Sequence, residues 1–131
     1  METNSFATKQ LPQIPDEVAP DGSEVRVLLR LQAGSMAHFE LPAGRVARAV
    51  THQTVEEVWF ITAGRGEMWR KLRDREEVVQ LEPGLCLTIP VGTHFQFRVD
   101  SAQAVAAIGV AMPPWPGDEE AVLVDGPWQA D

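Results

Sequence analysis

The sequence predicts an all-β fold, in which an antiparallel β-barrel or jelly roll encloses one hydrophobic core. Three observations lead to this prediction. Apolar and polar residues alternate over short segments, and the 10 Gly and 10 Pro fall between these segments, which is the pattern of strands joined by turns. The 131 residues are enough for one domain. Between residues 24 and 112 no amphipathic helix is apparent.

The strands are expected from a hydrophobic period of two. Val25, Val27, Leu29 and Leu31 alternate with polar residues, which indicates a half-buried strand that begins at residue 24. Gly and Pro residues end most of the apolar segments that follow. This pattern predicts further strands at residues 36–41, 46–52, 57–62, 67–73, 78–81, 85–89, 94–99 and 104–112, and a short one at 121–124.

Two flanking segments lack this period. Residues 1–22 contain three Pro residues and Gly22, and we expect them to form an N-terminal arm. Residues 23–112 then form the barrel. Residues 113–131 hold Trp115 and Trp128 among several Pro residues, and we expect this C-terminal tail to wrap around the barrel.

The charge of the chain argues against several classes of partner. It has 11 basic and 19 acidic residues and a net charge of −8, and such a surface repels phosphate backbones and anionic lipid. We therefore expect no nucleic-acid partner and no membrane. No apolar segment approaches the roughly 18 residues that a membrane helix needs. The first 15 residues hold no apolar signal segment and the one Cys has no partner for an intrachain disulfide, so we expect a cytoplasmic protein.

Two blocks of residues carry a more specific signal. In the first, five residues separate Gly44 from Val50-Thr51-His52, four separate His52 from Glu57, and six separate Glu57 from Gly64. This block resembles the first signature of the cupin superfamily, which reads Gly, five residues, His-x-His, three or four residues, Glu, six residues and Gly.

The second block begins at Gly84, continues after five residues with Pro90-Val91-Gly92, and ends with Thr93 and His94. It resembles the second cupin signature, in which Gly, five residues and Pro-x-Gly lead after two residues to a His and four residues later often to an Asn. Both blocks in this order imply a small single-domain cupin barrel. The chain departs from the signatures at three points, namely Val50 at the first His, one residue instead of two before His94, and Arg98 at the Asn.

The resemblance implies that His52, Glu57 and His94 bind a divalent transition metal, which would be Fe, Mn, Ni or Zn. Two imidazoles and one carboxylate leave coordination positions open for a substrate or water. A different placement of the gap in the first block would put Thr51 and Gln53 at the ligand positions instead. Without a metal, Glu57 would be paired with an interior Arg and the histidines would be ordinary buried side chains.

Side chains two residues apart on a strand share a face, and this rule predicts the walls of the cavity. Counting from the three implied ligands places Val50 and Ile61 inward, together with four candidate substrate-binding residues. These are Arg48, Trp59, Gln96 and Arg98. Two guanidinium groups beside a cavity are costly unless protein carboxylates or an anionic ligand pair with them, so they favour a small anionic ligand where no carboxylate does so. Either guanidinium could instead lie at the rim in solvent.

The same count places Phe95, Phe97 and Val99 on the face opposite His94. An apolar sheet face needs a cover, which the second sheet, the arm or another subunit could supply. Since small cupins tend to pair through their sheet edges, we expect a homodimer.

Three functions are compatible with these observations. The first is a small metal-dependent enzyme, an oxygenase, isomerase or lyase, that acts on a small anionic metabolite. The second is a non-catalytic cupin barrel that binds or senses a small molecule with a degenerate metal site. The third, with less support, is a structural dimer partner of another enzyme. Val50 favours the second function, whereas Glu57 and His94 favour the first.

Overall fold

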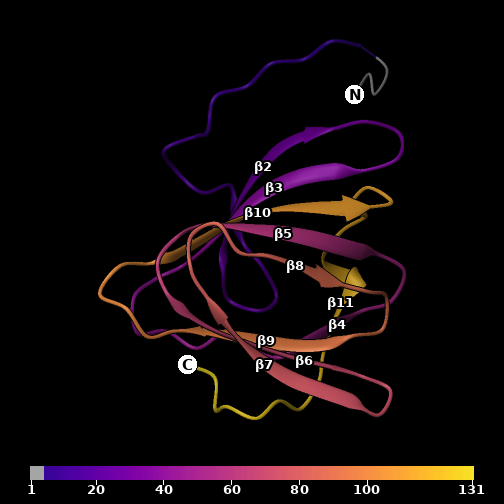
Figure 1. Cartoon of the computed structure of the whole chain (residues 1–131). Coiled ribbons are helices and arrows are strands. Elements are labelled where there is room, and N and C mark those ends of the chain that lie inside the picture. The colour runs from indigo at the N-terminus through magenta and orange to yellow at the C-terminus, as the bar shows by residue number, and fades with distance from the viewer. Residues whose placement is uncertain (1–4) are drawn as a thin grey trace.

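The computed structural model describes residues 5–131 and consists of two antiparallel β-sheets that face each other (Figure 1). In spatial order, the first sheet holds β1 (Glu17–Val18), β2 (Glu24–Arg30), β3 (Ser35–Leu41), β10 (Val105–Met112), β5 (Glu56–Ala63) and β8 (Cys86–Ile89). The second holds β11 (Ala121–Leu123), β4 (Val50–His52), β9 (His94–Val99), β6 (Gly66–Leu72) and β7 (Arg75–Leu81). A 3₁₀ turn, η1 (Asp118–Glu120), precedes β11. The predicted all-β jelly-roll barrel is confirmed.

The core lies between the two sheets, because alternate side chains of each strand point to the facing sheet. On β5 the buried positions are Glu57, Trp59 and Ile61, while Val58 and Phe60 on its other face are exposed. The second sheet contributes a matching inner face. Its core side chains include Val50, Met68, Leu81, Phe95, Phe97 and Val99.

Strand β4 is shorter than predicted, since it begins at Val50 and not at residue 46. The backbone before it bonds to the two flanking segments instead of continuing as a regular strand. The Arg48 N–H donates to the Asp21 carbonyl (2.8 Å), and the Ala49 carbonyl accepts from the Val124 N–H (3.0 Å). Both ends of the chain are therefore bound close to the first signature block.

Strand β7 is longer than predicted, because the preceding hairpin needs only two residues. Leu72 pairs with Arg75, so Arg73 and Asp74 alone form the turn. Arg73 takes a φ of 57°, the left-handed conformation that such tight turns require.

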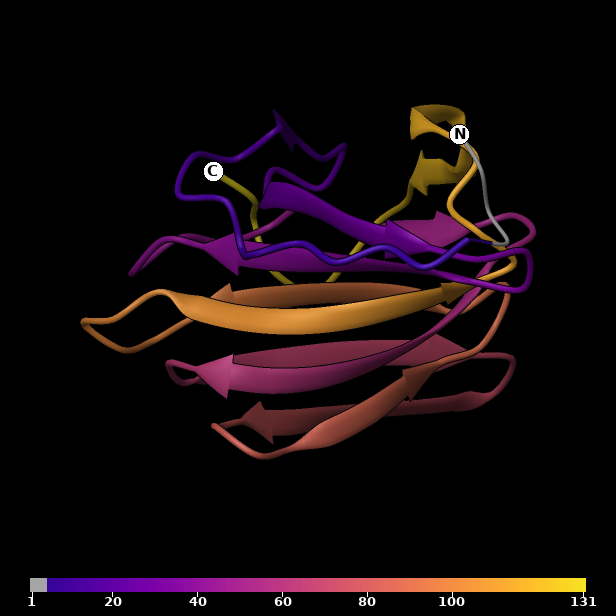
Figure 2. The ribbon, with the colours of Figure 1, turned by 90° about the horizontal axis from the view of Figure 1, so that it is seen from above.

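The described part of the arm, residues 5–22, lies along β2 (Figure 2). Arg26 holds it there: its guanidinium donates to the carbonyls of Pro12 (2.8 Å) and Gln13 (2.9 Å) and pairs with Glu40 (2.8 Å). Residues 1–4 of the predicted arm lie outside the described residues. Within residues 5–131, no helix has the length and apolar character needed to cross a membrane.

The apolar face that motivated the homodimer is not on the surface. Phe95, Phe97 and Val99 belong to the core, because β9 turns this face toward the first sheet. Exposed apolar side chains occur instead on the outer face of the first sheet, at Val58 and Phe60. The homodimer stays a prediction.

Candidate functional site

A cavity of about 200 Å³ lies inside the barrel, between β2, β3, β5 and β10 of the first sheet and β4 and β9 of the second. Four aromatic residues line it: Phe39, Trp59, Phe95 and Trp115. The Phe39 and Trp59 rings are stacked, with centroids 5.1 Å apart, and Phe95 meets Trp59 edge-on at 6.2 Å. The walls are therefore largely apolar and aromatic, as is usual for small-molecule sites.

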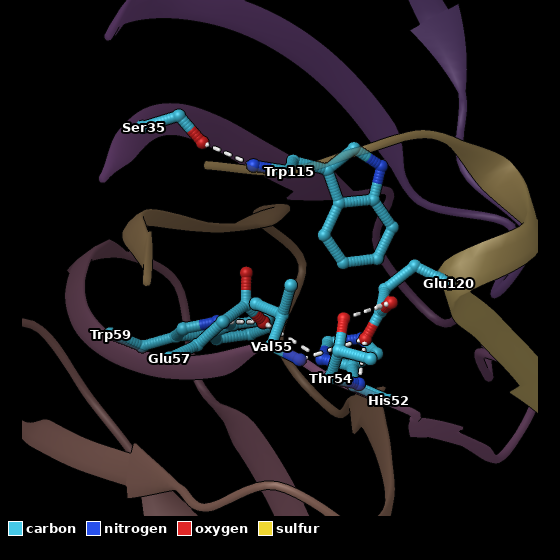
Figure 3. Close-up of polar contacts among 8 residues, drawn as sticks. All are labelled: Ser35, His52, Thr54, Val55, Glu57, Trp59, Trp115 and Glu120. Carbon is cyan, nitrogen blue, oxygen red and sulfur yellow. Dashed lines mark hydrogen bonds and ion pairs between the residues drawn. The ribbon is translucent and has the colours of Figure 1, made fainter. Parts of the chain in front are cut away.

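His52 and Glu57 are the polar groups at the centre of the site (Figure 3). They lie at either side of the β4–β5 turn, with side chains 5% and 4% exposed and Nδ1 and Oε1 3.7 Å apart. The indole N–H of Trp59 donates to Glu57 Oε1 at 3.3 Å. His52 Nδ1 makes no hydrogen bond. The first signature block thus places two groups that can carry a proton in the cavity, and no hydrogen bond joins them.

Burial determines the protonation of both groups. It raises the pKa of Glu57 from 4.5 to about 7, against the hydrogen bond from Trp59, and the Asp21 carboxyl adds to the rise. Burial lowers the pKa of His52 from 6.5 to about 4, against the opposing charge of Glu120. Between about pH 4 and pH 7 the site therefore holds a neutral carboxylic acid beside a neutral imidazole.

Asp21 is a residue of this cavity that sequence reasoning missed. It comes from the segment before β2, which shows no periodicity, and only its place in a short Asp-Gly-Ser turn marks it. Ser23 donates its N–H (2.9 Å) and its hydroxyl (2.7 Å) to Asp21 Oδ1. Burial nevertheless raises the pKa of the Asp21 carboxyl above its ordinary value.

His94 is not brought to the cavity. It pairs across the sheet with Thr51 on β4 and with Lys71 on β6, and such cross-strand partners share a face. The facing positions on the inner side are Val50 and Phe95, which both line the cavity. The two residues that the second signature places between Pro-x-Gly and its His are Thr93 and His94, so the His position itself falls on Phe95. The inward-facing residues of β9 are therefore Phe95, Phe97 and Val99, and not His94, Gln96 and Arg98 as predicted.

Three of the four predicted substrate contacts lie outside the cavity, and only Trp59 lines it. The change of face on β9 accounts for Gln96 and Arg98, whereas Arg48 precedes the regular part of β4. Gln96 lies under the C-terminal tail, donating to the carbonyls of Ala47 and Trp128 at 2.8 Å each. Arg98 pairs with Glu67 at 2.6 Å and lies 4.1 Å above the Trp128 ring. Arg48 is exposed. The two guanidinium groups that favoured an anionic ligand are thus outside the cavity, where Arg98 is paired with the Glu67 carboxylate and Arg48 is exposed to solvent.

The residues present do not fit a transition-metal centre. Of the four ligand positions implied by the signatures, His52 and Glu57 keep their donors, whereas Val50 and Phe95 are apolar. The Trp115 ring lies edge-on to the His52 ring, with centroids 4.9 Å apart. In residues 5–131 no group of three His, Cys, Asp or Glu side chains is arranged to hold a metal ion. The signature positions thus supply two donors, which fall short of the three or more protein ligands of typical sites.

Glu120 of η1 holds the turn that carries the site, and it was also missed. Its buried carboxylate accepts hydrogen bonds from the Thr54 N–H (2.5 Å), the Thr54 hydroxyl (2.7 Å) and the Val55 N–H (2.8 Å) (Figure 3). Although burial opposes ionisation, these bonds keep the pKa of Glu120 below its usual value. Because Thr54 and Val55 lie between His52 and Glu57, Glu120 fixes the position of both.

We expect Glu120→Ala to lower the free energy of unfolding by about 2–4 kcal/mol, because the change leaves two backbone donors and a hydroxyl without their charged partner. Urea titration followed by circular dichroism measures this difference. Glu119→Ala is the matched control, since the Glu119 side chain is exposed and only its carbonyl is used, by Gln53. Equal losses in the two variants would contradict the positioning role of Glu120.

The chain was compared with known proteins. No protein-family model matches the sequence, and none of the curated proteins does. Solved structures do match the fold. Ectoine synthase from P. lautus aligns with a TM-score of 0.71 and 18% identity, over 95% of this chain and 94% of its own. KdgF from Halomonas sp. aligns with a TM-score of 0.62 and 14% identity, over 76% and 86%.

The protein BH2720 from Bacillus halodurans aligns with a TM-score of 0.65 and 15% identity, over 78% of this chain and 76% of its own. These three neighbours have the cupin fold, and at such identities the likeness concerns the fold alone. The two facing antiparallel sheets agree with the two signature blocks in the sequence. This chain is a cupin-fold protein.

Proposed function

We propose that this protein binds a small molecule in the barrel cavity directly on its own side chains, without a transition-metal centre. The observation that carries the proposal is the pair of apolar residues at ligand positions: Val50 and Phe95 are cross-strand partners beside His52 and Glu57. The aromatic walls add support, because they can bury the apolar part of a ligand of modest size. The set of side-chain donors that the predicted metal-dependent chemistry needs is incomplete. The cytoplasmic location stays a prediction.

The test uses protein purified without chelator or metal-binding tag. We expect elemental analysis to find far less than one equivalent of Fe, Mn, Ni or Zn, and native mass spectrometry to find a small molecule that denaturation releases. Ala37→Leu fills the cavity wall and is expected to abolish this mass difference, while Ala102→Leu, at an exposed position, keeps it. About one equivalent of metal, lost in Glu57→Gln, would contradict the proposal.

A second candidate is an isomerase or lyase that moves protons without a metal. It is favoured by the Glu57 acid and the His52 imidazole, which face the same cavity 3.7 Å apart, because one can donate a proton while the other accepts one. The same mass measurement distinguishes it from simple binding. For an enzyme, the molecule recovered from Glu57→Gln differs chemically from the one recovered from the unchanged protein, whereas for a binding protein the two are identical.

A further inference from the structure

We propose that the cavity takes a small organic cation, with an ammonium group against Glu57 and Asp21 and a compact apolar body among the aromatic rings. This inference rests on the proposed function, since it assumes that the cavity holds a ligand. It goes further by assigning the ligand's charge, which is opposite to the one that the sequence favours.

The first argument is the distribution of charge around the cavity. Among the described residues that line it, the buried carboxyl groups are those of Asp21 and Glu57. The lining residue that carries a permanent positive charge is Arg30, whose side chain is exposed, and the exposed Asp118 lies in the same lining. Within residues 5–131, no lysine or arginine with a buried side chain lines the cavity beside the two carboxyl groups. An ionised carboxylate in an apolar interior is costly unless a cation accompanies it, and here the ligand would be that cation.

Two buried polar atoms at the centre of the site are incompletely bonded, since Glu57 Oε1 accepts only the 3.3 Å bond from the Trp59 indole and His52 Nδ1 accepts none. His52 Nδ1 has no partner although the side chain is only 5% exposed, and it lies 3.7 Å from Glu57 Oε1. This distance is too long for a direct hydrogen bond. A primary ammonium group carries three N–H donors, so one such group between the two atoms would satisfy both of them.

The third argument is the aromatic wall. Phe39, Trp59, Phe95 and Trp115 come from four separate parts of the chain and surround the same space. Aromatic rings attract cations through their negative faces, and the attraction is stronger where water is excluded. The rings also bury the apolar part of a ligand, so a cation with a hydrocarbon body fits this lining better than an inorganic ion does.

The size of the space limits the ligand. A volume of about 200 Å³ is below the roughly 300–1,000 Å³ of sites for drug-sized ligands. Gly109 on β10 keeps even this space open, because a Cβ there would lie 2.5 Å from Phe39 Cε2 and 3.2 Å from Trp59 Cδ1. The ligand is therefore a small amine with one short chain or one ring.

The test compares three probes of equal shape and different charge at pH 8, namely benzylammonium, benzyl alcohol and benzoate, by isothermal titration calorimetry. We expect benzylammonium to bind at least tenfold more tightly than benzyl alcohol, and benzoate to bind most weakly. A parallel set of butylammonium, 1-butanol and butyrate covers the case that a ring is too large. The inference is overturned if a neutral or anionic probe binds as tightly as its cation, or if neither cation binds.

Two neighbouring variants locate the effect. Glu57→Gln keeps the shape of the side chain but removes its charge, and we expect it to weaken benzylammonium binding at least tenfold while changing benzyl alcohol binding less than threefold. Glu56→Gln is the matched control, because Glu56 lies on the opposite, exposed face of β5, and it should leave both affinities unchanged. Unfolding curves of both variants confirm that they are folded. Equal cation affinities in Glu57→Gln and the unchanged protein would also overturn the inference.

The outcomes separate this inference from the proposed function. If benzyl alcohol or benzoate enters the cavity more tightly than benzylammonium, the cavity is a ligand site and only the charge assignment fails. If metal analysis finds a stoichiometric transition metal that depends on Glu57, the proposed function itself fails.

Discussion

The double variant Val50→His/Phe95→His is expected to bind Zn(II) at least about a hundredfold more tightly than the unchanged protein, because two further imidazoles would join His52 and Glu57. Val50 and Phe95 are direct cross-strand partners, both only 2% exposed, and both line the cavity. Each added imidazole that reaches the metal needs to contribute only about 1.4 kcal/mol for a tenfold gain. Four donors of this kind complete a typical zinc coordination set.

Competition with a chromogenic chelator measures the affinity, and thermal unfolding with and without Zn(II) shows whether the metal binds the folded state. The buried imidazoles lower the midpoint without metal, since each unsatisfied polar group costs about 1–3 kcal/mol, and added Zn(II) should restore it. His94→Ala in the same background is the control and should change nothing, because His94 is on the outer face of β9. A double variant with the affinity of the unchanged protein would show that Val50 and Phe95 are not at ligand positions.

The second large effect concerns pH. The pKa of Glu57 is raised from 4.5 to about 7 in the folded protein, so folding favours the protonated form. The stability that this group contributes is fully present below pH 4.5 and is lost as the pH rises to about 7. At about 1.4 kcal/mol for each tenfold change in proton affinity, the loss amounts to about 3 kcal/mol. His52, with a pKa lowered to about 4, has the opposite effect, since its contribution is present above pH 6.5 and is lost as the pH falls.

Glu57→Gln removes the first of these two contributions. We expect the variant to match the unchanged protein at pH 4, where Glu57 is largely protonated in both the folded and the unfolded state, and to be more stable by about 3 kcal/mol at pH 8. Urea unfolding at the two pH values measures the difference, and Glu56→Gln should show none. A variant that is less stable at both pH values would indicate an ion pair between Glu57 and protonated His52 instead.

The fold could be predicted because its signals are local. On β5, buried and exposed side chains alternate without interruption from Glu57 to Thr62, and the sequence reproduces this strand to within one residue at each end. The two signature blocks then identify the barrel, since their Gly residues and their spacing belong to turns within it. Neither signal needs knowledge of distant contacts.

Which face of β9 points into the barrel could also have been predicted, but the signals in the sequence conflict there. The histidine in the second block favours His94 as the inward residue, whereas the two-residue spacing of the signature and hydrophobicity both favour the face of Phe95, Phe97 and Val99. The structure follows hydrophobicity. Burying three apolar side chains is worth several kcal/mol, and turning that face toward solvent would lose this free energy. On β9, hydrophobic alternation is therefore a better guide than the presence of a His near the motif position.

The remainder of the site depends on contacts between distant segments, which periodicity does not describe. Asp21 lies before the first long strand, and Trp115 and Glu120 lie after the last one. Each reaches the β4–β5 region from a segment rich in Pro or Gly. Their roles become visible only when the two flanking segments are placed on the barrel.

Because both flanking segments line one cavity, a ligand bound there would stabilise segments from both sides of the barrel sequence at once. A molecule seated against Asp21, Glu57 and Trp115 would touch both flanking segments, so an opening that separates these segments would break contacts to it. Ligand at a hundred times its Kd would add about 2.7 kcal/mol against such opening. Amide hydrogen exchange should then slow together in β2 and β11, although these two strands lie far apart in the sequence.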